Sequence, residues 1–126
     1  MRMTKEDVAK SYLNFLENDQ VEEIMALFAE DGIVVSPLYG TMPAKSFYKT
    51  LAADTANSVL NFDGVFYEDN TNRISLLFDY DWELKTGEKV SFKVVDIIEL
   101  NDDHKINKLI IIYDTVHSRP AIQQKG

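Results

Sequence analysis

Apolar residues recur at helical spacing along the first third of the chain. Residues 4–18 place an apolar stripe on one helical face, and residues 19–31 repeat that pattern up to Gly32, which we expect to end the second helix. Residues 33–37, "IVVSP", predict a short strand that ends at the proline. A third helix is predicted to begin near Pro43, because proline suits the first position of a helix.

From residue 58 onward the pattern changes to the alternation of apolar and polar residues that is typical of strands. We predict strands at residues 58–68, with a bend at Asp63-Gly64, and at residues 73–84, 89–100 and 106–116. The last of these has an unbroken apolar run, which predicts burial on both faces. Helices followed by a meander of strands indicate an α+β fold, in which three helices pack on a strongly curved antiparallel sheet that forms a cone.

The aromatic residues of the strand at 73–84 share one face. We expect Phe78, Tyr80 and Trp82 to face inward and Asp79 and Asp81 to face solvent or an interface. The outer face of the predicted sheet would still carry apolar residues of the last two strands. Such a surface predicts a homodimer that forms through the outer sheet face.

Asp96 lies in the middle of the apolar face of the strand at 89–100. An ionised carboxylate is costly to bury, so a buried aspartic acid usually takes up a proton and becomes a hydrogen-bond donor. The structural alternative is that Asp96 is ionised and paired with Arg73, with Arg119 or with backbone amides. The sequence leaves both interpretations open.

Composition narrows the classes of function. The chain has 126 residues, which suits one domain over residues 1–126, with 118–126 as a frayed tail. A net charge of −8 argues against nucleic acid and anionic membranes as partners. The chain has no cysteine and only two histidines, so we expect no metal site, and no cofactor is indicated. No long apolar run or secretion signal is recognised, so we expect a cytoplasmic protein.

Three segments carry a resemblance to a known family. "SYLNFLENDQVEEIMALFAEDGIVVSP", "SFYKT" and "VVDII" resemble the first two helices and first strand, the third helix and an acid-bearing strand of ketosteroid isomerase. That enzyme belongs to the nuclear-transport-factor-2-like (NTF2-like, SnoaL-like) superfamily, and the resemblance spans nearly the whole chain. It implies that Tyr12 and a protonated Asp96 donate hydrogen bonds to a substrate oxyanion, with Tyr48 supporting Tyr12 as a third catalytic residue. A neutral aspartic acid in this enzyme is an established example of a tuned pKa.

The sequence departs from the family at the catalytic base. The family has an aspartate directly before the proline that ends the first strand, and this chain has Ser36 there, in "VVSPLYG". A serine hydroxyl without a partner cannot shuttle protons near neutral pH. Asp114 is a substitute by weak analogy with polyketide cyclases of this fold, but the gap-free match places Tyr113 inside and Asp114 outside.

Two functions follow from the resemblance. The first is an isomerase, cyclase or dehydratase that binds a small hydrophobic carbonyl-bearing molecule in an internal pocket. Substrate-binding residues would be Ser36, Phe78, Tyr80, Trp82 and Tyr113. The alternative is a non-catalytic module of the same fold that binds a hydrophobic ligand or serves dimerisation, and loss of the base favours it. Whether the chain is an enzyme stays open at this point.

Overall fold

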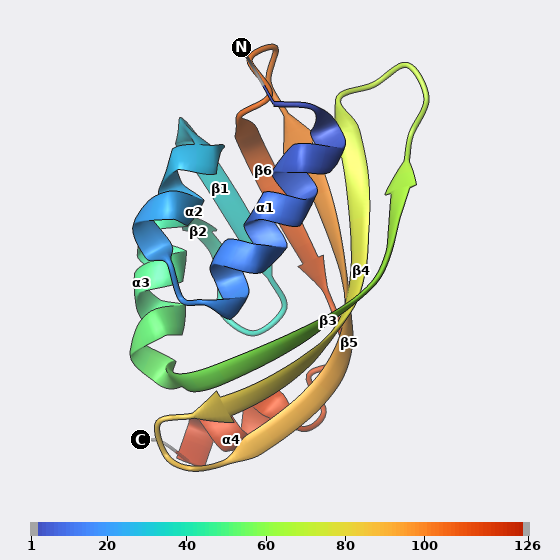
Figure 1. Cartoon of the computed structure of the whole chain (residues 1–126). Helices are drawn as coiled ribbons and strands as arrows, with labels where there is room; N and C mark the ends of the chain where they lie inside the picture. Colours follow the sequence, from blue (N-terminus) through green and yellow to red (C-terminus); the bar gives the residue numbers. More distant parts are fainter. Residues whose placement is uncertain (1–2, 125–126) are drawn as a thin grey trace.

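The computed structural model describes residues 3–124, with side chains through residue 122. The helices are α1 (Lys5–Glu17), α2 (Val21–Leu27), α3 (Ala44–Asp54) and α4 (Ser118–Gln124). The strands are β1 (Phe28–Ser36), β2 (Gly40–Pro43), β3 (Thr55–Tyr67), β4 (Arg73–Leu84), β5 (Lys89–Leu100) and β6 (Ile106–Ile112). Figure 1 shows α1, α2 and α3 on one side of the sheet, and α4 at its lower end, where the hairpin of β4 and β5 also lies.

The six strands form one sheet in the order β2-β1-β6-β5-β4-β3. The chain leaves β1 through β2 and α3, crosses to the far edge, and returns by a meander until β6 lies beside β1 in the same direction. The sheet is therefore mixed, and the prediction of an antiparallel sheet was wrong at this pair.

The sheet is also not strongly curled, although the sequence predicted strong curvature. Curling needs bulges or glycine kinks on neighbouring strands. β3 has a bulge between Phe62 and Gly64, at the predicted bend. Its neighbour β4, however, pairs with β5 without a register shift from Arg73 to Glu83, so this central pair lacks such kinks.

The second helix is shorter than predicted, because β1 already begins at Phe28. Gly32 does not end a helix but lies within β1. A Cβ atom there would come within 2.8 Å of both the Ile106 carbonyl oxygen and the Phe28 ring. The glycine therefore permits close packing of β1 on β6, and this long-range constraint has no local sequence signal.

The inner face of the sheet and the helices enclose the core. Thr4 caps α1 as its side chain accepts a hydrogen bond from the Asp7 backbone N–H at 3.1 Å. On β4, Phe78 and Trp82 are buried as predicted. Asp79 faces outward as expected, 3.4 Å from Lys93 on β5. Period-two alternation thus located the inner face correctly.

The C-terminal third differs from the sequence interpretation in two respects. Leu109 of β6 is fully buried, but Ile112 on the opposite face is 52% exposed, so β6 is not buried on both faces within the chain. The segment expected to fray instead forms α4, in which Ser118 and Ala121 are buried. Residues 125 and 126 lie outside the described part. No helix between residues 3 and 124 is long and apolar enough to cross a bilayer.

Candidate functional site

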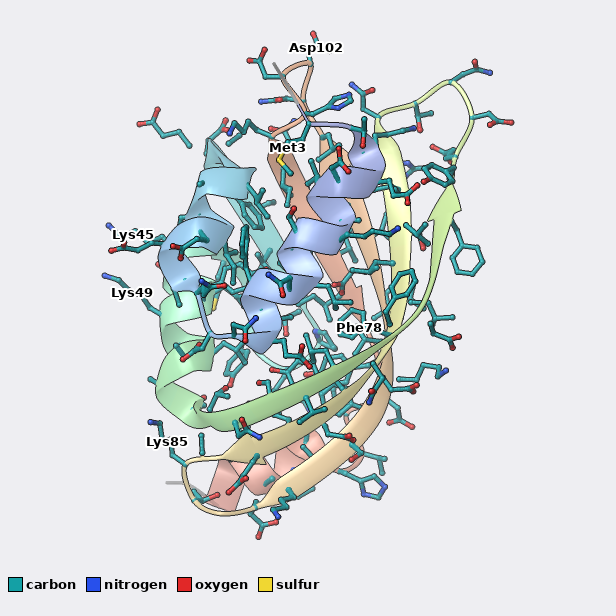
Figure 2. The ribbon with its side chains drawn as sticks, viewed as in Figure 1. Met3, Lys45, Lys49, Phe78, Lys85 and Asp102 are labelled. Atoms are coloured by element: carbon teal, nitrogen blue, oxygen red, sulfur yellow. The ribbon has the colours of Figure 1, made fainter. Side chains whose placement is uncertain are left out.

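A cavity lies between the helices and the inner face of the sheet. It is lined by Tyr12, Leu16, Ser36, Tyr39, Phe47, Leu51, Phe78, Tyr80, Trp82, Phe92, Val94, Asp96, Ile111 and Tyr113. Figure 2 shows Phe78 among the interior side chains, whereas Lys45, Lys49, Lys85 and Asp102 project outward. The cavity volume, as the space open to the centre of a water molecule, is about 40 Å³. That is room for a few waters and well below the ~150 Å³ of a cavity that accepts benzene.

Asp96 provides a polar group at the buried end of this cavity. It lies on β5 between Leu76 of β4 and Ile111 of β6 and is 1% exposed. Neither carboxyl oxygen has a hydrogen-bond partner among the described residues. Burial raises the pKa of Asp96 well above its usual range, which favours the protonated acid.

The structural alternative for Asp96 is not found in the described residues. Arg73 instead binds Glu68 through two hydrogen bonds of 2.8 and 2.7 Å. Arg119 donates to the Pro37 carbonyl oxygen at 2.6 Å. Asp96 is therefore not held as an anion by either of these guanidinium groups.

Tyr12 of α1 and Tyr48 of α3 form a hydroxyl pair beside the same cavity. Their oxygens are 2.7 Å apart, and both residues are 1% exposed. Burial is the main cause that raises the pKa of each well above the usual value, so both stay protonated. Only Tyr12 lines the cavity. If Tyr48 donates to Tyr12, the Tyr12 proton is left to point into the cavity.

Ser36 ends β1 and also lines the cavity. Its Oγ accepts hydrogen bonds from the backbone N–H groups of Leu38 at 3.1 Å and Tyr39 at 3.2 Å. These contacts fix the turn into β2, a local role that serine often takes. Ser36, where the resemblance placed the missing base, therefore stabilises the backbone turn.

Asp114, the substitute base suggested by analogy, and the outward-facing Asp81 do not line the cavity. Asp114 is exposed, and its Oδ1 accepts from the Val116 N–H at 2.9 Å. Asp81 accepts a hydrogen bond from Ser91 at 2.7 Å on the outer side of the sheet. Tyr113 lies inside, as the sequence match implied.

A second buried carboxyl group, which was not predicted from the sequence, lies beside the cavity. Asp54 at the end of α3 is 3% exposed, and the Tyr39 hydroxyl donates to its Oδ2 at 2.6 Å. Asp54 follows Phe47 and Leu51 at helical spacing, so it is an acid on an apolar stripe. That anomaly, which singled out Asp96, would also have identified Asp54.

Aromatic rings form one wall of the cavity. Tyr80 and Tyr113 each stack on Phe92, with ring centres 5.4 and 4.2 Å away. The Trp82 Nε1 donates to Thr55 at 2.8 Å, and burial raises the pKa of Tyr80 to about 12. The wall thus offers apolar ring faces, with its polar atoms either paired or neutral. Among residues 3–122, no cluster of acids and histidines is placed to hold a metal ion.

Comparisons with known proteins give the fold and no more. No protein-family model matches the chain, and no curated protein is significantly similar to it in sequence. A Catenulispora acidiphila protein of ketosteroid-isomerase-like fold, solved with trimethylamine, is 14% identical with a TM-score of 0.75; 89% of this chain and 88% of that chain align.

Two further structures agree with that result. An NTF2-like protein of unknown function from Burkholderia pseudomallei is 15% identical with a TM-score of 0.78, over 90% of this chain and 93% of that one. TerC, co-crystallised with polyporic acid, is 16% identical with a TM-score of 0.78, over 94% of this chain and 98% of that one. This chain therefore has the NTF2-like, ketosteroid-isomerase-like fold, which is also found in a protein described as a putative hydroxylase and in proteins of unknown function.

Proposed function

We propose that this NTF2-like chain binds a small hydrophobic carbonyl compound in its cavity and stabilises the enolate formed from it. Tyr12 and protonated Asp96 are the two hydrogen-bond donors to the carbonyl oxygen. The reaction is a double-bond isomerisation or a related cyclisation or dehydration. The observation that carries this proposal is the buried Asp96 carboxyl group, which has no partner in the described chain and lines one cavity with Tyr12.

The energetics support a ligand that accepts hydrogen bonds. A buried polar group without a partner costs about 1–3 kcal/mol, and a ligand oxygen would recover that cost. Donors fixed in a water-poor site stabilise developing negative charge more than donors in water do. The Tyr48 hydroxyl holds that of Tyr12 in place, so less ordering is required when the ligand binds.

The size of the cavity restricts the ligand. A ring compound does not fit into about 40 Å³, so side chains must move apart on binding. Tyr39, Phe92 and Tyr113 line the cavity and are only partly buried, whereas Tyr12 and Asp96 are almost completely buried. Entry is therefore between the partly exposed rings, with the carbonyl oxygen leading towards the buried donors.

Binding of para-nitrophenol tests the oxyanion site, because its phenolate resembles an enolate and absorbs visible light. We expect Tyr12→Phe and Asp96→Val each to weaken binding by about 1–3 kcal/mol, or about 5- to 150-fold in Kd. Asp96→Asn should lie between wild type and Asp96→Val, because an amide still donates. Calorimetry and the visible spectrum of the bound phenolate measure the effect.

A matched control is Tyr67→Phe. Tyr67 also pairs its hydroxyl with another side chain, that of Glu6, but lies on the surface outside the cavity. Its loss should leave binding unchanged. Equal affinities of wild type, Tyr12→Phe and Asp96→Val would refute the two-donor site.

Ser36 favours a second candidate function, non-catalytic binding of the same class of ligand. β1 ends in this serine instead of a carboxylate. The serine Oγ accepts hydrogen bonds from two backbone N–H groups. A binding module would take up para-nitrophenol without removing protons from a carbonyl compound. Exchange of a ketone's α-hydrogens with deuterated water distinguishes the two functions.

We also propose that a second copy of the chain covers the outer face of the sheet. Two neighbouring rows there are largely apolar: Phe66, Ser75, Ile97 and Ile110 in one, and Leu77, Val95 and Ile112 in the other. One adjoining row carries Arg73, Glu99 and Lys108, and the other carries Asp79 and Lys93. A two-fold axis through the patch would bring these oppositely charged groups together.

Ile112→Lys tests this dimer, because Ile112 is 52% exposed and its replacement disturbs no core contact. We expect wild type to sediment as a dimer at micromolar concentration and the variant as a monomer, since a buried lysine without a partner is costly. Val59→Lys is the control, at an exposed apolar site on edge strand β3 outside the patch. A monomeric wild type, or a dimer unaffected by Ile112→Lys, would disprove the interface.

A further inference from the structure

We propose that Tyr39 and Asp54 form the proton relay of this site, with Tyr39 as the group that exchanges a proton with the substrate carbon. This inference rests on the proposed function and supplies the base that position 36 lacks. Tyr39, which lines the cavity, is the catalytic residue. Asp54 accepts the proton that the Tyr39 hydroxyl gives up.

The geometry places the relay on the same cavity as the oxyanion donors. Tyr39 shares the cavity lining with Tyr12 and Asp96, and its hydroxyl proton is directed to Asp54 Oδ2 at 2.6 Å. A hydroxyl that donates in one direction keeps its oxygen lone pairs for another partner. A substrate carbon in the cavity would therefore face an oxygen that can accept a proton as it passes its own to Asp54.

The backbone at the end of β1 explains how Tyr39 reaches this position. Ser36 Oγ accepts from the Tyr39 N–H, and the turn closes at Gly40, whose φ of 80° suits glycine. The Tyr39 ring contacts the edge of Phe47, with ring centres 5.8 Å apart and planes at 81°. Ser36 thus contributes to proton transfer as a positioning residue for Tyr39.

The location of Asp54 is unfavourable for a merely structural acid. It is the last residue of α3, where the helix dipole disfavours negative charge, and it is 3% exposed. A short hydrogen bond from Tyr39 offsets part of this cost. The Asp54 carboxylate is placed to accept the proton that Tyr39 passes on.

The proposed step balances without any co-reactant. The C–H bond next to the carbonyl breaks, its proton goes to the Tyr39 oxygen, and the Tyr39 hydroxyl proton goes to Asp54 Oδ2. The electron pair of the C–H bond moves into the carbonyl, whose oxygen is held by Tyr12 and Asp96. In the second half, Asp54 returns its proton to Tyr39, and Tyr39 delivers one to another carbon of the enolate. The product is the conjugated isomer.

The pKa of Tyr39 agrees with a relay. Burial, and next the hydrogen bond to Asp54, raise it above the usual value of tyrosine. Tyr39 is therefore not present as a phenolate before the substrate binds. The hydroxyl can act only by giving up one proton as it gains another, and this requires the acceptor behind it.

The test uses the β,γ-unsaturated isomer of cyclohexenone, whose conversion to the conjugated enone is followed by ultraviolet absorption. Hydrogen exchange of its α-carbon with deuterated water is followed by NMR. We expect Tyr39→Phe and Asp54→Asn to lower both rates by about 100-fold or more, with para-nitrophenol affinity within about threefold of wild type, because the oxyanion donors remain. Tyr67→Phe, which breaks a surface tyrosine–carboxyl pair, should change neither.

The outcomes separate this inference from the proposed function. If wild type binds para-nitrophenol but catalyses no exchange, the relay is disproved and the oxyanion site remains. If wild type catalyses exchange and Tyr39→Phe retains the rate, another group is the base. If para-nitrophenol does not bind at all, the proposed function itself fails. Melting temperatures show whether Asp54→Asn folds, and Tyr39→Phe, which keeps the ring, provides the second variant.

Discussion

Asp96→Asn should remove a large pH dependence from the stability of the folded chain. Burial raises the pKa of Asp96 in the folded state well above the value of 3.8 expected for an exposed aspartic acid. Between these two pKa values the folded state binds one more proton than the unfolded state. The free energy of unfolding of wild type then falls by up to about 1.4 kcal/mol for each unit that the pH rises.

The sign follows from proton binding in each state. Below the unfolded pKa, Asp96 is protonated in both states and contributes no slope. As the pH rises above it, the unfolded chain releases this proton while the folded chain retains it, so unfolding becomes easier until the folded pKa is reached. Asparagine has no proton to release. The stability of Asp96→Asn relative to wild type should therefore increase with pH over this window.

Urea unfolding at a series of pH values measures this difference. Val94→Ala is the matched control, because it shortens a buried side chain of the same strand, β5, and removes no titratable group. Its curve should run parallel to that of wild type. If the Asp96→Asn curve also ran parallel, Asp96 would have the same pKa in the folded and unfolded states, and the neutral oxyanion donor would be ruled out.

Ser36→Asp should raise the rate of cyclohexenone isomerisation by about 100-fold, the lower range of what a positioned base contributes. Ser36 lines the cavity and is 5% exposed. A carboxylate there can keep the hydrogen bonds from the Leu38 and Tyr39 N–H groups, because aspartate forms the same type of turn. It would accept a proton from the substrate directly, which is easier than transfer through a neutral hydroxyl.

A double variant connects this prediction to the Tyr39–Asp54 relay. In Tyr39→Phe, the added Ser36→Asp should restore isomerisation, because the new carboxylate needs no relay. Ser46→Asp, an exposed position on α3, adds the same charge away from the cavity and should change nothing. Failure of Ser36→Asp to raise the rate in either background would show that position 36 does not reach the reacting carbon.

The local elements could be predicted because their signals are local. Helical spacing located α1 and α3, and alternation located β4 and β5 and showed that Phe78 faces the core while Asp79 faces outward. The same alternation identified Asp96 as a carboxyl group on an apolar face, and the structure confirms its burial. The proposed roles of Tyr12, Tyr48 and Asp96 stay predictions.

The errors lie where distant segments meet. The end of α2 was placed too late because Gly32 resembles a helix stop, whereas its constraint comes from Ile106 on another strand. The parallel pairing of β1 with β6 depends on how the meander returns across the sheet. Asp54 itself carried a local signal, as an acid on an apolar stripe, but its contact with Tyr39, 15 residues earlier in a turn, had none.

By itself, then, the sequence determined the α+β class, the inner faces of the central strands and the presence of one anomalous acid. Helical and strand periodicities depend on residues only a few positions apart, so each can be recognised within a single segment of the chain. Only the tertiary structure decided that Asp96 pairs with neither Arg73 nor Arg119, that Tyr12 contacts Tyr48, and that Tyr39 in the cavity lining contacts Asp54. Those relations depend on distances between separate elements, which are set by the packing of the whole core.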